Sequence, residues 1–154
     1  MFVILLFSSC TKMVMSVDKK QDFKIKDNLL ILTHDNLAAR DFIISLKNYL
    51  ALNIEGHKIK VTKHNIIADE KYETDIPDLK YVMDITLVDV ETQFSNQILK
   101  RGKFMVNILD YKTKEIVWTN EVKIKRIFDS DKISTSKKIA KKVVENLDKA
   151  LIFN

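Results

Sequence analysis

The sequence holds few of the residues that break or cross-link a chain. Its 154 residues include only two glycines (Gly56 and Gly102), one proline (Pro77) and one cysteine (Cys10). So little glycine and proline excludes flexible linkers, proline-rich recognition segments and a glycine-rich phosphate loop. A single cysteine excludes an internal disulfide. A chain of this length suits one domain, which can bury a core without cross-links.

Arginine is also scarce. The net charge is +5, from 26 lysines and arginines against 21 acidic residues, and the only arginines are Arg40, Arg101 and Arg126. Proteins that read nucleic acids mostly use arginine for two-pronged contacts with bases and phosphates. The lysine excess therefore indicates a solvated surface, with weak attraction to anionic lipid headgroups as the alternative. We expect no nucleic-acid partner.

The residues that carry metal or catalytic chemistry are scattered. The three histidines, His34, His57 and His64, do not have the spacing of a zinc site. Asp84 and Asp89 lie five residues apart on one expected strand, so we predict that they face opposite sides of the sheet. The sequence therefore predicts no catalytic residue, no metal and no cofactor.

His34 and Asp35 are the pair with the best claim to a ligand crevice, because they follow an expected buried strand. Capping of the next helix explains Asp35 equally well, and we favour that interpretation. An enzyme with a scattered site near His34, Asp35 and the polar segment 65–80 stays open as an alternative. It would require a pocket with convergent polar groups.

The first ten residues have the layout of an export signal. Phe2 to Phe7 are all apolar, and the small residues Ser8 and Ser9 separate them from Cys10. The run is too short to cross a bilayer, which takes about 20 apolar residues. Leu6-Phe7-Ser8-Ser9-Cys10 resembles the lipobox of bacterial lipoproteins, in the relaxed form found in Bacteroidota-like envelopes.

This resemblance implies that residues 1–9 are a cleaved signal peptide, and that Cys10 carries diacylglycerol and a further acyl chain such as palmitate. Residues 10–22 would be a lipidated tether, and the domain would begin at Phe23. No basic residue precedes Lys12, so we expect a start codon further upstream. In Bacteroidota-like lipoproteins an acidic run after the cysteine is associated with surface display, and none follows Cys10, so the resemblance implies a periplasm-facing protein on the cell membrane or outer membrane. The alternative is a buried strand at Phe2–Phe7, with Cys10 as a core thiol.

Hydrophobic periodicity predicts a single α+β domain over residues 23–154. The expected strands are 27–34, 57–64, 81–90, 102–111 and 116–127, and the expected helices follow Asn36 and span 134–151. The order is β-α-β-β-β-β-α, a mixed sheet of about five strands packed by two helices, with the first two strands parallel. Expected helix caps are Asp35 or Asn36, Gly56, and one residue among Ser134, Thr135 and Ser136.

The segment Asp110–Trp118, placed before a terminal helix, resembles a broad set of small envelope lipoproteins. These include the penicillin-binding-protein activator lipoproteins, and their fold resembles the N-terminal domain of the Tol-Pal translocation protein. The resemblance implies no catalytic residues. We therefore expect a non-catalytic, lipid-anchored envelope protein that binds a protein partner or helps to assemble a complex. A soluble binding module, possibly for nucleic acid, is the alternative.

Overall fold

The computed structural model describes residues 12–37, 39–67, 73–93, 98–128, 131–150 and 152–153. Cys10 and the expected signal peptide therefore lie outside the described residues. In chain order the elements are β1 (Lys12–Lys19), β2 (Asn28–His34), α1 (Arg40–Glu55), β3 (Lys60–Ile66), β4 (Tyr81–Gln93), β5 (Ile98–Asp110), β6 (Ile116–Phe128) and α2 (Lys132–Lys149).

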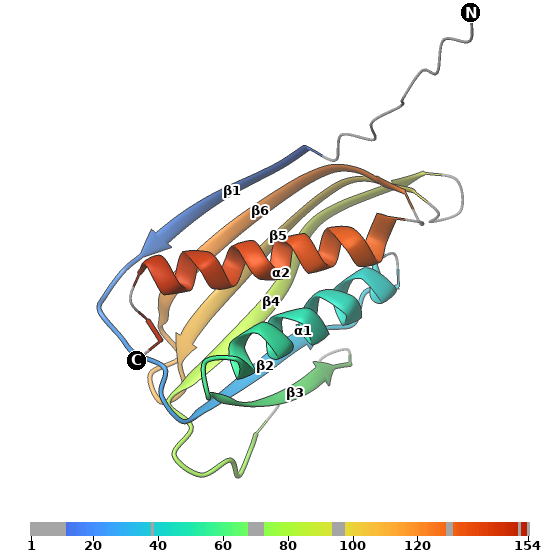
Figure 1. Ribbon diagram of the computed structural model, residues 1–154. Helices are drawn as coiled ribbons and strands as arrows, with labels where there is room; N and C mark the ends of the chain where they lie inside the picture. Colours follow the sequence, from blue (N-terminus) through green and yellow to red (C-terminus); the bar gives the residue numbers. More distant parts are fainter. Residues whose placement is uncertain are drawn as a thin grey trace, which may run out of the picture.

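The strands form one mixed sheet in the order β1-β6-β5-β4-β2-β3. β2 runs parallel to β3 and β4, and the remaining neighbours are antiparallel. Figure 1 shows α1 and α2 side by side on the same face of this sheet. The α+β class, the single domain and the parallel pair β2–β3 are confirmed, with six strands in place of about five.

The core lies between the sheet and the two helices. Strand residues alternate between the faces, so Leu29 and Ile31 of β2 point into the core while Leu30 and Leu32 point to the other side. Trp118 in β6 is the largest fully buried side chain. Phe42 of α1 meets Phe104 of β5 with ring centroids 5.7 Å apart, which joins helix and sheet.

The segment expected to be a tether is part of the sheet. Lys12–Lys19 forms β1, an edge strand paired antiparallel with β6 from Lys12 opposite Lys125 to Lys19 opposite Trp118. Lys12 lies eleven residues before the expected boundary at Phe23, so the domain begins earlier than predicted. An edge strand buries little of either face, and Val14 and Val17 of β1 are exposed. Such a strand needs no regular apolar pattern, which is why the sequence did not predict it.

The helix ends differ from the expected caps. α1 begins after Ala39 without a side-chain cap, and Gly56 at its other end has a right-handed φ of −58°. The left-handed residue of this turn is Lys58, with φ 64°. α2 begins after Asp131, so the predicted cap Ser134 lies inside its first turn. Tertiary packing therefore sets these boundaries more than local capping does.

A β-bulge corrects the prediction for Asp89. The register of β4 against β5 shifts between Leu87, which is opposite Phe104, and Asp89, which is opposite Lys103. Val88 is the extra residue, and after it the alternation of side chains between the two faces of the sheet is shifted by one position. Asp84 and Asp89 therefore share the face of the sheet away from the helices, because Asn107 and Lys103, opposite them, also share it.

Lys47 is a buried cation within the helix layer. Its side chain lies on α1 and is 8% exposed, and its Nζ donates to Thr33 Oγ1 at 3.1 Å. Burial lowers the pKa of Lys47, and the nearby charge of Lys63 lowers it further. The charged lysine is therefore held in the folded protein at a cost in stability.

We expect Lys47→Met to raise the free energy of unfolding at pH 7 by about 1 kcal/mol, because it removes a buried charge and keeps the side-chain length. The pKa of Lys47 is below 10.5 in the folded state, so the unfolded chain binds the proton more tightly. The difference in free energy of unfolding between the variant and the wild type should therefore shrink as the pH rises toward 10.5. Urea unfolding at several pH values measures this, with exposed Lys60→Met as control. An advantage independent of pH would contradict the assignment.

Candidate functional site

The helices cover one face of the sheet, and the other face is partly open. On this open face, the segment 73–80 before β4 places Leu79 against Leu30 and Val82. Ile76 and Tyr111 pack against the same residues. This is a second, smaller apolar cluster. This cluster ends beside a pocket on the open face of the sheet.

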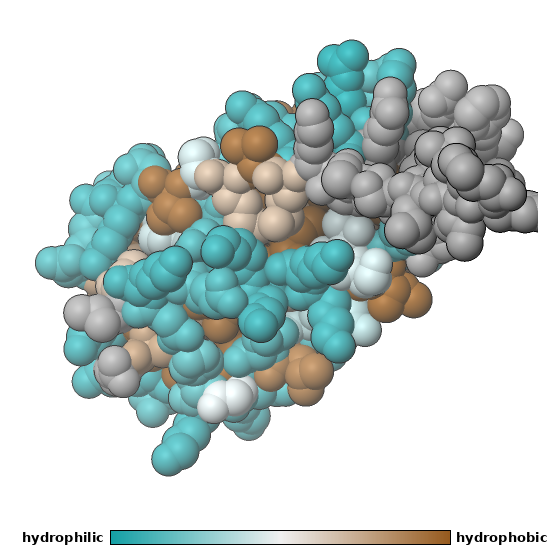
Figure 2. Space-filling model, turned by 45° about the horizontal axis from the view of Figure 1, so that its top comes forward, coloured by the Kyte–Doolittle hydropathy of each residue, from teal (hydrophilic) through white to brown (hydrophobic). Residues whose placement is uncertain are grey.

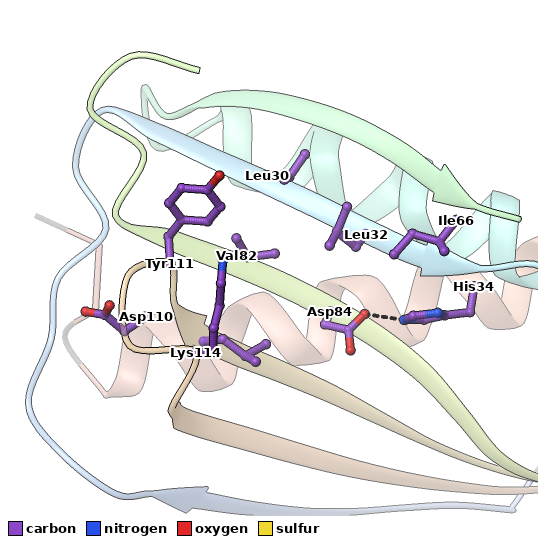
Figure 3. A pocket seen from close by; sticks show the side chains of 10 residues that line it. Leu30, Leu32, His34, Ile66, Val82, Asp84, Asp110, Tyr111 and Lys114 are labelled. Atoms are coloured by element: carbon purple, nitrogen blue, oxygen red, sulfur yellow. Dashed lines mark hydrogen bonds and ion pairs between the residues drawn. The ribbon is translucent and has the colours of Figure 1, made fainter. Parts of the chain in front are cut away.

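The pocket encloses about 160 Å³. Its lining is mostly apolar and comes from four strands and the hairpin between β5 and β6: Leu30, Leu32, His34, Ile66, Val82, Asp84, Leu109, Asp110, Tyr111 and Lys114. Figure 3 shows the polar members at two ends, with His34 and Asp84 at one and Tyr111, Asp110 and Lys114 at the other. Such a volume suits one apolar side chain or a small amphipathic group.

At one end, His34 Nε2 lies 2.8 Å from Asp84 Oδ1. Thr86 Oγ1 donates to the other oxygen of Asp84 at 2.9 Å, so the carboxylate is held from both sides. The pair forms because β2 and β4 are parallel neighbours, which brings residues 50 positions apart together. A histidine oriented by a carboxylate can accept or donate a proton, or bind a polar group of a ligand.

At the other end, the hairpin between β5 and β6 positions Lys114. This residue has a left-handed φ of 61°, and its Nζ lies 3.8 Å from the centroid of the Tyr111 ring. The ammonium is therefore attracted to the ring face. The Tyr111 backbone N–H donates to Lys80 O at 2.7 Å, which fixes the hairpin against the start of β4.

Asp110 closes the same hairpin. Its Oδ1 accepts the backbone N–H groups of Lys112 and Thr113, each at 2.9 Å. These bonds, above all the one from Thr113, lower the pKa of Asp110 below its usual 3.8. The ionised carboxylate therefore stabilises the folded hairpin, and protonation weakens it.

We expect Asp110→Ala to lower the free energy of unfolding at pH 7 by about 1 kcal/mol, because two backbone N–H groups lose a charged acceptor. The folded pKa is depressed, so this stabilisation is complete above pH 3.8 and is lost as the pH falls through the folded value. The variant and the wild type should therefore converge in acid. Denaturation curves at neutral and acid pH measure this, with exposed Asp18→Ala as the comparison. A loss equal at both pH values would contradict it.

The structure separates the pair that the sequence suggested. His34 lines the pocket, whereas Asp35 lies 3.5 Å from the Nε of Arg40 and its backbone N–H donates to Ile66 O. The acidic partner of His34 is Asp84. Predicting this pair from the sequence would have required knowing that β4 lies beside β2. His57 stacks on Phe153 with ring centroids 4.4 Å apart, away from His34.

The outer face of α2 is rich in lysine. The lysines of the outer face of α2 (Lys137, Lys138, Lys141 and Lys142) are exposed, on a surface that is mainly hydrophilic in Figure 2. Across the described ranges, no group of three or more histidines, cysteines and acidic residues could hold a metal ion. Likewise, no helix in the described part of the chain is long and apolar enough to cross a membrane.

The structure is an α+β domain with both helices on one face of the sheet and a mostly apolar pocket on the other. No protein-family model and no curated protein sequence matches the chain. Among solved structures, the chain is similar to the PelC dodecamer from Paraburkholderia phytofirmans, with a TM-score of 0.56 and 8% identity over 86% of this chain and 95% of that one.

A single-residue variant of PelC, also a dodecamer, gives a TM-score of 0.50 and 11% identity over 83% of this chain and 94% of that one. At such identities the likeness shows the fold alone. It extends over nearly the whole of the PelC chain in those structures.

Proposed function

We propose that this chain is a non-catalytic cell-envelope lipoprotein, anchored through lipid on Cys10, whose domain binds a protein partner. The lipobox-like sequence before Cys10 supports the anchor. One observation carries the binding function: both helices pack on one face of the sheet, while the other face has a mostly apolar pocket open to solvent. The proposed location is the cell membrane or outer membrane, with the domain in the periplasm.

Further copies of this chain are the first partner to test. The similar PelC structures are dodecamers, which makes self-assembly a reasonable proposal for a domain of this fold. The open-face pocket would then accept an apolar side chain from a neighbouring copy. The mass of the particle in solution measures such self-assembly directly.

Light scattering on the chain extracted from membranes in detergent tests this assembly. We expect a particle of several times the mass of one lipidated protomer. Leu32→Lys, which places a charge in the pocket, should reduce it to the monomer. Leu52→Lys, at a position 64% exposed on α1, is the matched control and should leave it unchanged. A monomeric wild type at micromolar concentration would contradict self-assembly.

An enzyme is the second candidate, and the His34–Asp84 pair at the rim of the pocket is the observation that favours it. An imidazole held by a carboxylate suits general acid–base work. The mostly apolar lining of the pocket favours binding over catalysis. His34→Gln separates the two: assembly persists in a binding module, whereas the enzyme would lose its turnover.

A further inference from the structure

The position of β1 fixes where a lipid on Cys10 leaves the domain. β1 begins at Lys12, so two peptide units connect it to Cys10, a span of at most about 7 Å. The first residues of β1 lie opposite the last part of β6, with Val14 opposite Lys123. An acylated Cys10 therefore holds this end of the sheet directly at the membrane.

The open face of the sheet is basic at this end. The anchor-end surface comprises Val14 of β1, Lys100, Arg101 and Lys103 of β5, and Lys123 and Lys125 of β6. Arg101 lies opposite Lys125, and Lys103 lies opposite Lys123, so cations occupy consecutive open-face positions on both strands.

Three acidic side chains lie among these cations: Asp89, Glu91 and Glu121. Glu91 contacts Lys100 at 2.6 Å and Arg101 at 3.3 Å. Glu121 contacts Lys103 and Lys123, each at 2.8 Å. Each glutamate is thus shared by two cations. Five cations against three carboxylates leave this surface with a surplus of two positive charges.

Apolar side chains are exposed at the same end. Leu37, 81% exposed, follows the carboxyl end of β2, and Ile67, 63% exposed, follows that of β3. Ile133 is 62% exposed in the first turn of α2, which follows the end of β6. Figure 1 shows these ends of the strands and the beginnings of both helices on the same side of the molecule. Lysine together with exposed apolar residues is typical of surfaces that rest on lipid headgroups.

We propose that, once Cys10 is acylated, the anchor-end surface lies on anionic phospholipid headgroups. This inference rests on the proposed lipid anchor and adds an orientation to it. Each lysine near an anionic surface contributes roughly a fivefold gain in binding. The hairpin end of the pocket, with Tyr111 and Lys114, lies farther along the strands: Leu109 is eight residue steps along β5 from Arg101, a distance of about 26 Å. His34 and Ile66 at the other end of the pocket lie nearer to the anchor end. The hairpin end of the pocket is thereby held away from the membrane.

Fluorescence quenching of the lipidated full chain in vesicles tests this orientation. Because Cys10 is the only cysteine and is acylated, an added cysteine can be labelled alone. Val88→Cys, in β4 beside the Lys103 position, reports the anchor end, and Lys112→Cys, in the far hairpin, reports the hairpin end of the pocket. The vesicles contain phosphatidylcholine with or without phosphatidylglycerol, and a lipid with a nitroxide on its headgroup as quencher.

We expect several-fold stronger quenching at position 88 than at position 112 in vesicles with phosphatidylglycerol. The double reversal Lys123→Glu and Lys125→Glu should weaken the quenching at position 88, whereas Lys138→Glu with Lys141→Glu, the same charge change on α2, should leave it unchanged. High salt should reduce it by screening. Equal quenching at both positions on an acylated chain would overturn the orientation alone. An intact mass showing no acyl group on Cys10 would overturn the anchor and this proposal together.

Discussion

Replacing Trp118 by alanine is expected to lower the free energy of unfolding by about 3–5 kcal/mol. The Trp118 side chain is fully buried in β6, opposite Ile108 of β5 and Lys19 of β1, and belongs to the main core. Truncation removes a large apolar surface from the core and leaves a cavity between the sheet and the helices. For a domain of this size, the loss is a large part of the total stability.

Trp118→Phe is the matched variant for this experiment. The indole Nε1 of Trp118 has no hydrogen-bond partner among the described residues, so phenylalanine keeps an aromatic ring and leaves no donor unpaired. We expect a cost of about 1.5 kcal/mol or less for this change. Chemical denaturation followed by circular dichroism measures both variants. A cost below about 1 kcal/mol for alanine would contradict the place of Trp118 in the core.

Replacing Cys10 by alanine is expected to move the protein out of the membrane fraction almost completely. Two or three acyl chains make attachment effectively permanent, since each buried methylene contributes roughly 0.8 kcal/mol. The +5 net charge of the domain is far too weak to hold it there without them. Fractionation of cells that express either form measures the change.

The same variant separates the anchor from the alternative in which Phe2–Phe7 is a core strand and Cys10 a core thiol. Under our proposal, residues 1–9 are removed as a signal peptide and Cys10 carries lipid outside the domain, so neither adds to the core. The unfolding transition of Cys10→Ala should therefore match that of the wild type. A destabilisation of about 2 kcal/mol or more would favour the core-thiol alternative.

The elements with strong periodicity were predictable from the sequence. β2 has a continuous apolar run, α1 and α2 have apolar stripes, and β4 to β6 alternate, so their existence and type are confirmed. β1 was missed because an edge strand that leaves Val14 and Val17 exposed has no clear apolar pattern. The boundaries of α1 also differed, because packing replaced the expected cap at Asp35 or Asn36.

The pocket was only partly predictable. His34 at the end of a buried strand was a candidate from its position alone, but its partner Asp84 depends on which strand lies beside β2. Strand order is a tertiary property, and periodicity within one strand does not contain it. The shared face of Asp84 and Asp89 depends likewise on the bulge at Val88, for which the sequence offers no local signal such as glycine.

Metabolic labelling with a clickable palmitate tests the central proposal most directly. Wild type and Cys10→Ala are expressed in a bacterial host, with any upstream start codon restored, and the label is read on the purified chain. The proposal predicts label on the wild type alone, in the membrane fraction. An unlabelled wild type recovered in the cytoplasm would contradict the lipid anchor and leave the soluble binding module and the enzyme as the remaining hypotheses.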